Sequence, residues 1–185
     1  MEALADYLKT EVIDGKIYDM SPATLKHQAI QRNLSVIIGG FLRGKICRMF
    51  TETGVELDEN NYFIPDLLVV CDHNKLTENG IKGAPDFVVE ILSPSTRRKD
   101  ITLKKDAYER FGVKEYWIID PKAESIEAYL LRDGKYVLDG VYHNIGENEL
   151  NWKRMSEDEK AEIRLSLKIS LYDDLELQTK DIFEL

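Results

Sequence analysis

The chain has 185 residues, 43% of them hydrophobic and 32% charged, which predicts one globular domain over residues 1–185 with a proper core. Its apolar runs are far too short to span a bilayer. Its N-terminus lacks the basic flank and apolar run of a secretion signal, so we expect a cytoplasmic protein without a membrane anchor. The net charge of −9 argues against tight, non-specific nucleic-acid binding, which depends on Lys and Arg neutralising phosphates.

The first quarter of the chain predicts a β-hairpin followed by a helix. The hairpin covers residues 11–18 around an Asp14-Gly15 turn. Ser21-Pro22 resembles a helix start. Apolar residues then recur at helical spacing: Ala29, Ile30, Leu34, Ile37, Ile38, Phe41 and Leu42.

The middle of the chain alternates strands with a loop and a second helix. We predict strands near residues 46–52, over 62–70 and over 86–92, with a polar loop around 72–83. Residues 93–96, with the sequence Ser-Pro-Ser-Thr, break the third of these strands. A helix then runs from about Asp100 to Phe111 and is closed by Gly112.

The remaining segments predict further strands and two helices. A strand at 116–119 precedes a hairpin of residues 124–131 and 135–142 around Asp133-Gly134. Ser156 and Glu159 fit a capping box, residues 163–169 alternate like a strand, and Asp173 to Leu185 fit a C-terminal helix with Leu175, Ile182 and Phe183 inward. The fold class is α/β: a central mixed β-sheet flanked by helices, with an N-terminal hairpin and additional C-terminal strands.

The two cysteines, Cys47 and Cys71, lie in apolar surroundings without the spacing of metal ligands. We therefore expect reduced core residues of a cytosolic protein rather than a disulfide.

Two acidic residues, Asp66 and Glu90, lie within short apolar runs that read as buried strands. Strand alternation turns Glu90 to the same face as Val88 and Leu92. A carboxylate in such surroundings loses hydration and needs a cation, a metal or a hydrogen-bond donor. Two such acids suggest a shared divalent metal. The alternatives for Glu90 are a solvated edge strand or a salt bridge that serves packing alone.

A lysine on the helix after the Glu90 strand is the third candidate. Lys104 falls between Tyr108 and Phe111 on the predicted apolar face, which Ile101, Leu103 and Ala107 share. A lysine in an apolar stripe must meet an acid or reach water, and Glu90 or Asp66 is the natural partner. The alternatives are a lysine that extends to solvent, or one paired with Asp100 at i,i+4.

Two carboxylates and a lysine suit phosphodiester hydrolysis. The carboxylates supply hard oxygen ligands for Mg²⁺ or Mn²⁺, with a backbone carbonyl and waters completing the shell. The metal lowers the pKa of a bound water and neutralises charge on the scissile phosphate. A lysine can position the attacking water or stabilise the negative charge of the transition state.

Several motifs resemble a known family. Ile64-Pro65-Asp66 followed by Glu90 resembles the PD-(D/E)XK nuclease superfamily. Residues 85–96 (Pro-Asp-Phe-Val-Val-Glu-Ile-Leu-Ser-Pro-Ser-Thr) and 112–121 (Gly-Val-Lys-Glu-Tyr-Trp-Ile-Ile-Asp-Pro) are similar to the Uma-type family of restriction endonuclease-like proteins. The same likeness includes a set of single residues and short runs: Ile13-Asp14-Gly15, Ser21-Pro22, His27, Asp100, Lys104 and Tyr108.

The resemblance implies a restriction-endonuclease-like core and a metal-dependent endonuclease that hydrolyses DNA. It assigns Asp66 and Glu90 as metal ligands and catalytic residues, and Lys104 as the catalytic lysine. The superfamily pattern places that lysine two residues after the second acid, where this chain has Leu92. The lysine has therefore moved to the following helix. The rival interpretation is a catalytically silent nucleic-acid-binding or protein-interaction module with the same fold.

Other residues rank lower as site candidates. Glu11 and His27 could reach the site, or be ordinary surface or capping residues. Arg97, Arg98 and Lys99 are candidates for contacts with the DNA backbone. A homodimer is plausible, because cutting both strands is simplest with two related sites.

Overall fold

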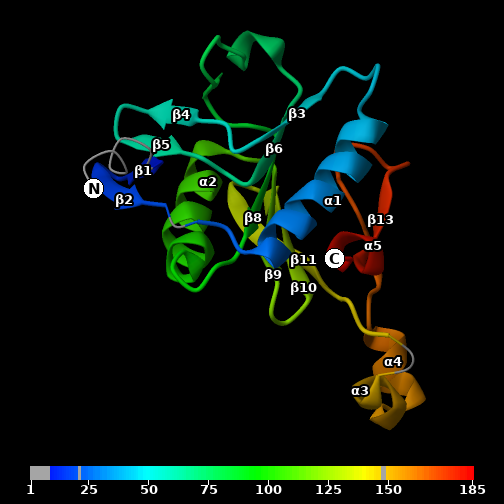
Figure 1. The fold of residues 1–185 in the computed structure, drawn as a ribbon. Coiled ribbons are helices and arrows are strands. Elements are labelled where there is room, and N and C mark those ends of the chain that lie inside the picture. The colour runs from blue at the N-terminus through cyan, green and yellow to red at the C-terminus, as the bar shows by residue number, and fades with distance from the viewer. Residues whose placement is uncertain (1–8, 21, 147–148) are drawn as a thin grey trace.

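The computed structural model describes residues 9–20, 22–146 and 149–185. Its elements are, in chain order, β1 (Thr10–Ile13), β2 (Lys16–Asp19), α1 (Leu25–Phe41), β3 (Arg48–Thr51), β4 (Val55–Asp58), β5 (Asn61–Phe63), β6 (Leu67–Val70), the 3₁₀ turn η2 (His73–Lys75), β7 (Ile81–Lys82), β8 (Phe87–Ile91), the π-helical turn η3 (Lys99–Lys104), α2 (Lys105–Phe111), β9 (Glu115–Asp120), β10 (Ser125–Arg132), β11 (Lys135–His143), α3 (Leu150–Arg154), α4 (Glu157–Glu162), β12 (Ser166–Lys168), β13 (Glu176–Gln178) and α5 (Thr179–Phe183) (Figure 1).

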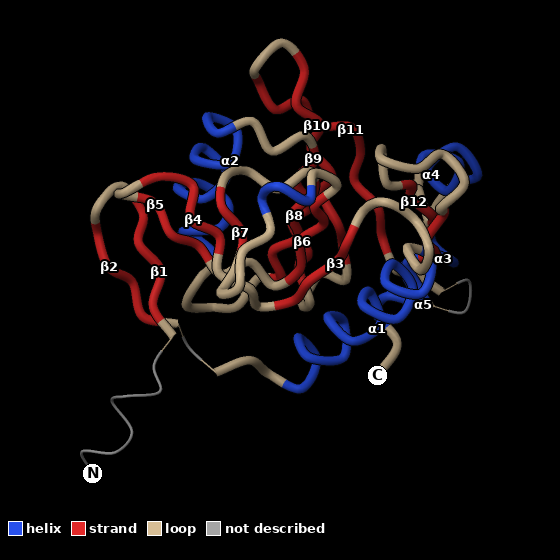
Figure 2. Tube along the Cα trace, turned by 90° about the horizontal axis from the view of Figure 1, so that it is seen from above, coloured by secondary structure: helices blue, strands red, loops and turns tan. Residues whose placement is uncertain are grey.

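The larger sheet is mixed and has the strand order β11-β10-β9-β8-β6-β3. Strands β8 and β9 are parallel, and the other neighbours are antiparallel. A second sheet, with the order β2-β1-β5-β4-β7, lies beside it (Figure 2). The central mixed sheet flanked by helices is thus confirmed, whereas the sequence did not predict that the N-terminal hairpin joins β4, β5 and β7 in a second sheet.

The two predicted hairpins are present and have a local cause. Asp14 and Gly15 have φ values of 47° and 75°, and Asp133 and Gly134 have 51° and 77°. Two consecutive residues with positive φ match the strand twist in a two-residue turn, and Asp-Gly is among the pairs that tolerate this conformation. These turns fix the register of β1 with β2 and of β10 with β11.

Two apolar layers cover the faces of the larger sheet. Ile30, Leu34 and Ile38 of α1 pack against β6, β8 and β9 on one face, together with residues of β12, β13 and α5. Ala107 and Tyr108 of α2 pack on the other face, between the two sheets. Because Phe87, Val89 and Ile91 belong to the first layer and Val88 and Leu92 to the second, the predicted alternation along β8 is confirmed.

Helix α1 begins later than the sequence predicted. Its N-cap is Thr24, whose Oγ1 accepts a hydrogen bond of 3.2 Å from the His27 backbone N–H. Ser21, the residue at which we expected the start, lies outside the described residues. Pro22 precedes the cap without belonging to the helix.

The helix before β9 differs from the prediction in its first half. Residues 99–104 form a π-helical turn, and α2 ends at Gly112 with φ 83°, as expected. The wider turn changes which side chains face inward: Ile101 and Leu103 are 40% and 39% exposed, whereas Asp100 and Lys104 are buried. The predicted apolar face is therefore wrong at Ile101 and Leu103 and right at Ala107 and Tyr108.

The C-terminal helix is shorter than predicted. Glu176–Gln178 form β13, which pairs with β12, and only Thr179–Phe183 are helical. Pairing with β12 satisfies the backbone of the first half, so helix formation is not needed there. The inward packing of Leu175, Ile182 and Phe183 and the capping box at Ser156 are confirmed.

The expectation of reduced cysteines is wrong, because Cys47 and Cys71 form a disulfide. Strands β3 and β6 pair with Arg48 opposite Val70, and the same register extended by one residue brings the two cysteines together. Because the two cysteines are bonded, they no longer support the expectation of a cytosolic location. In the part of the chain that the structure describes, no helix is both long and apolar enough to cross a membrane.

Candidate functional site

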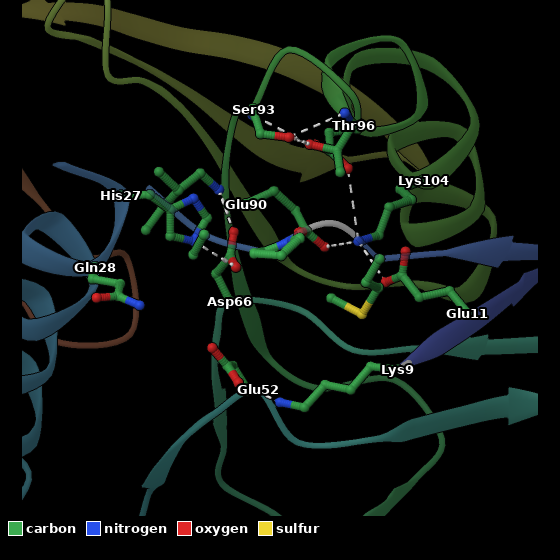
Figure 3. Close-up of a pocket in the computed structure, with 15 residues that line it drawn as sticks. Lys9, Glu11, His27, Gln28, Glu52, Asp66, Glu90, Ser93, Thr96 and Lys104 are labelled. Atoms are coloured by element: carbon green, nitrogen blue, oxygen red, sulfur yellow. Dashed lines mark hydrogen bonds and ion pairs between the residues drawn. The ribbon is translucent and has the colours of Figure 1, made fainter. Parts of the chain in front are cut away.

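A cavity of about 390 Å³ opens where β6 begins and β8 ends, between the two sheets and the start of α1 (Figure 3). Most of its polar lining carries charge. The lining residues that matter chemically are Lys9, Glu11, His27, Glu52, Asp66, Glu90, Asp100 and Lys104. All three residues predicted for the site, Asp66, Glu90 and Lys104, line this one cavity.

Sheet register brings the two predicted acids together. Strands β6 and β8 are antiparallel, with Leu67 opposite Val89, and the same register extended by one residue places Asp66 opposite Glu90. Asp66 Oδ2 also accepts a hydrogen bond of 2.7 Å from the Ile91 backbone N–H. The Asp66 carboxylate is therefore held against the end of the Glu90 strand.

Glu90 is 3% exposed and lies beside the helix rather than in solvent. Its Oε1 accepts hydrogen bonds of 2.9 Å from the Tyr108 hydroxyl and 2.7 Å from Lys104 Nζ. Burial raises the pKa of Glu90 well above its usual value, and this outweighs the opposing attraction of Lys104. The nearby carboxylates Asp100, Asp66 and Glu11 add to the increase. The solvated-edge interpretation of Glu90 is excluded.

Lys104 is 2% exposed and ends among three carboxylates. Its Nζ lies 2.7 Å from Glu90 Oε1, 2.7 Å from Glu11 Oε1 and 3.7 Å from Asp100 Oδ1 (Figure 3). Burial alone would lower the pKa of Lys104, but the attraction of Glu90, Glu11 and Asp100 raises it well above its usual value. Lys104 therefore stays protonated at neutral pH.

Glu11 belongs to this cluster, although the sequence ranked it low. It is 1% exposed, and its Oε1 contacts both Lys104 Nζ and the Ile64 backbone N–H, the latter at 3.0 Å. Burial raises the pKa of Glu11, but Lys104, the Ile64 N–H and Lys99 more than offset this and lower it. The sequence did indicate that Glu11 is buried, because Glu11 shares its strand face with the core residue Ile13.

His27, also ranked low, contacts the other side of Asp66. Its Nε2 lies 3.0 Å from Asp66 Oδ1. Burial lowers the pKa of His27, but the hydrogen bond and the charge of Asp66 raise it overall. The signal was its position at i−3 and i−7 from Ile30 and Leu34, on the buried face of α1.

The basic residues after β8 lie in different surroundings. Lys99 is only 9% exposed and its Nζ lies 3.3 Å from Glu11 Oε2, so its ammonium is engaged inside the protein, and its contact with a DNA backbone stays a prediction. Arg97 lines a second cavity of about 220 Å³ together with Lys26 and Lys122, and Ser93 lines both cavities. A second cavity lined by three basic residues and one acid, Asp120, therefore adjoins the acidic cavity.

The cavity contains carboxylate oxygen atoms suited to a hard cation, although the described side chains are not already arranged as a metal site. Among the described residues, no three His, Cys, Asp or Glu side chains already form a metal-binding group. Asp100 Oδ1 is buried and has no hydrogen-bond partner among these same residues, and Asp100 lines the cavity. Buried carboxylate oxygens of this kind fit Mg²⁺ or Mn²⁺, with a backbone carbonyl and waters as further ligands.

Comparisons with known proteins identify the class. Residues 1–166 match the Uma2 family, described as "Putative restriction endonuclease". The chain belongs to this family, so a nuclease-like function is supported at that level. The fold resembles the crystal structure of "a putative nuclease belonging to DUF820 from Anabaena variabilis ATCC 29413", with a TM-score of 0.71, 24% identity, and coverage of 94% of this chain and 89% of that one.

Two relatives come from Synechocystis sp. (strain ATCC 27184 / PCC 6803 / Kazusa). "Uncharacterized protein slr1290" is 28% identical over 168 residues, which cover 88% of this chain and 82% of the relative. "Uncharacterized protein sll1609" is 27% identical over 127 residues, which cover 65% of this chain and 71% of the relative. The restriction-endonuclease-like fold agrees with the sequence-based expectation.

Proposed function

We propose that the protein is a metal-dependent endonuclease that hydrolyses phosphodiester bonds in DNA. The observation that carries this proposal is the convergence of Asp66, Glu90 and Lys104 on one cavity. Asp66 directly precedes β6, Glu90 lies on β8 and Lys104 ends the π-helical turn η3. They match the acid, acid and lysine that such a reaction needs. A homodimer, with one site for each DNA strand, is part of the same proposal.

Charge balance supports a divalent cation at this site. Among the described residues, the buried carboxylates of Glu11, Asp66, Glu90 and Asp100 face two buried ammonium groups, those of Lys99 and Lys104, and the imidazole of His27. When the four carboxylates and the two ammonium groups are all ionised, the cluster has an excess of two negative charges with His27 neutral and of one with His27 protonated. Because buried charges need partners, one divalent ion held by Asp66 and Glu90 would supply the missing charge.

The protein's own groups have distinct roles in the proposed reaction. A bound Mg²⁺ or Mn²⁺ would neutralise charge on the scissile phosphate and lower the pKa of a water. His27 and the Ile91 N–H orient the Asp66 carboxylate. The Lys104 ammonium has three N–H donors, and Glu11 and Glu90 take two of them at 2.7 Å. The third has Asp100 Oδ1 at 3.7 Å, beyond hydrogen-bond distance, and can donate to negative charge on the phosphate. The raised pKa of Lys104 favours the charged ammonium, which cannot act as a general base.

Calorimetric titration with Mn²⁺ tests the proposed metal site. We expect heat of binding for the wild type and none for the double variant Asp66→Asn/Glu90→Gln, because both proposed ligands lose their charge. At a Mn²⁺ concentration of about 100 times Kd, binding should add about 2.7 kcal/mol to the free energy of unfolding of the wild type alone. Asp86→Asn is the control, since Asp86 pairs with Lys114 outside the cavity. Equal titrations for wild type and double variant would favour the catalytically silent module.

The second cavity supports a contact with the DNA backbone next to the cleaved bond. Lys26, Arg97 and Lys122 line it, although Arg97 also pairs with Asp120 and Lys26 with Glu124. If Lys122 neutralises one phosphate, Lys122→Ala should reduce the slope of log K against log salt by about 0.9. Fluorescence anisotropy with labelled duplex DNA measures this slope. Lys135→Ala, on a lysine that pairs with Glu109, should leave the slope unchanged, and the same slope for both variants would contradict the assignment.

A further inference from the structure

Glu11 is the buried carboxylate that the two-acid-plus-lysine pattern does not use. It comes from β1 in the smaller sheet, whereas Asp66 and Glu90 lie on strands of the larger one or at their ends. Both of its oxygens are engaged: Oε1 by Lys104 Nζ and the Ile64 N–H, and Oε2 by Lys99 Nζ. Ile64 lies two residues before Asp66, so one carboxylate contacts the segments that carry both Asp66 and Lys104.

Lys104 needs external positioning because of where it is attached. With Leu92 at the strand position, the lysine comes from the π-helical turn η3 instead. The turn directs the side chain inward, but a lysine carries about 2 kcal/mol of rotamer entropy and can end in several places. One of its attractive partners is Glu90 at 2.7 Å, which is also a proposed metal ligand.

A lysine bound to Glu90 alone would compete with the metal for that carboxylate. Glu11 lies at the same distance from Lys104 Nζ, 2.7 Å, and Figure 3 shows the amine between the two acids. Lys99 and the Ile64 N–H hold Glu11 in turn. Glu11 is therefore held by partners other than Lys104. Because it shares the Lys104 ammonium with Glu90, the ion pair between Lys104 and Glu90 is weaker than it would be alone.

We propose that Glu11 is a positioning residue that holds the Lys104 ammonium in place, leaving Glu90 available to the metal and one N–H of Lys104 available to the phosphate. The inference rests on the proposed nuclease function and adds a residue to it. Glu11 takes over the positioning that a strand backbone would provide for a lysine at position 92.

A double-mutant cycle between Glu11 and Lys104 tests this inference. We expect Glu11→Gln to lower kcat by about 10- to 100-fold, equivalent to about 1.4–2.7 kcal/mol, with little change in KM. It should also raise the Kd for Mn²⁺ several-fold in calorimetry. In the Lys104→Met background the same Glu11→Gln change should alter both quantities by less than about twofold, because a positioning effect needs the positioned lysine.

The cycle separates positioning from two other effects. If Glu11 acted only through its charge on the metal, its effect on the Kd for Mn²⁺ would persist without Lys104. If it acted only by holding Ile64, its effect on kcat would persist as well. Either additive result overturns the inference. Glu115→Gln is the matched control, because Glu115 is also 1% exposed but bonds to Trp117 and Ser170 outside the cavity; its kcat and Kd should equal those of the wild type.

Structure and folding provide readouts that do not depend on activity. A crystal structure of Glu11→Gln should show Lys104 Nζ displaced toward Glu90 or Asp100, and an unmoved amine contradicts the inference. Thermal unfolding checks that the variant folds; if it does not, Glu11→Asp keeps the charge with a shorter reach and should give an intermediate kcat. A wild type that neither binds Mn²⁺ nor cuts DNA overturns the proposed function itself. If the wild type is active and Glu11→Gln has the same kcat and the same Kd for Mn²⁺, only the positioning role is overturned.

Discussion

Asp66→Asn is expected to lower metal-dependent DNA cleavage by about 10³-fold or more, because several kcal/mol of charge stabilisation disappear with the metal. The substitution keeps the shape of the side chain and an oxygen that can still accept from the Ile91 N–H. The fold should therefore survive, and thermal unfolding checks this. Initial rates of plasmid nicking with Mg²⁺ or Mn²⁺ measure the effect. Glu90→Gln should behave alike.

The control for this prediction is Asp86→Asn, the same chemical change at the residue just before β8, as Asp66 lies just before β6. Asp86 accepts a hydrogen bond from the Cys71 N–H and pairs with Lys114, and it does not line the cavity. Its cleavage rate should remain within about twofold of wild type, since substitutions away from the reacting groups change little. Wild-type rates in Asp66→Asn would exclude Asp66 from the reaction.

Lys104→Met is expected to lower kcat by about 10²–10³-fold, the loss seen when one donor to a developing charge is removed. KM should change little if the lysine acts mainly in the transition state. The variant also leaves Glu11, Glu90 and Asp100 without their shared cation, which should cost about 3–5 kcal/mol in the free energy of unfolding. Single-turnover cleavage and urea unfolding measure the two effects separately.

Lys105→Met is the matched control for this variant. Lys105 is the next residue, and its Nζ lies over the Tyr129 ring, 3.5 Å from the centroid, rather than in the cavity. Its kcat should equal that of the wild type. A Lys104→Met protein that folds and cleaves at the wild-type rate would remove the lysine from the mechanism.

The pH dependence follows from the direction of the Lys104 shift. Because its pKa is raised above the ordinary 10.5, the ammonium keeps its charge through neutral and mildly alkaline pH. We therefore expect no decline in kcat from deprotonation of Lys104 below pH 10.5. A decline centred below that pH, and absent from Lys104→Arg, would contradict this.

The position of Glu90 could be anticipated because strand alternation is local, whereas Asp66 lies in the break between β5 and β6 and not within the single strand over 62–70 that we predicted. Apolar runs of β-branched residues predict buried strands, and a period of two then says which side chains share a face. The hairpins at Asp14-Gly15 and Asp133-Gly134 are local in the same sense, since two residues decide the turn.

The face of the helix before β9 could not be anticipated in full. A period of 3.6 predicts inward positions for Ile101 and Leu103, but the π-helical turn places both at the surface. The turn instead directs Lys99, Asp100 and Lys104 inward. Their ion pairs with Glu11 and Glu90 connect segments far apart in sequence, and no local pattern reports such contacts.

The sequence by itself determined the two Asp-Gly hairpins, the alternation of faces along the strand that carries Glu90 and the family likeness, because these depend on residues only a few positions apart. Tertiary structure alone decided that Glu11 and His27 join the site, that Lys99 is buried, and that Cys47 and Cys71 are bonded. Each of these depends on which strands and helices become neighbours when the chain folds. Burial then sets the partners and charges of the side chains that meet there.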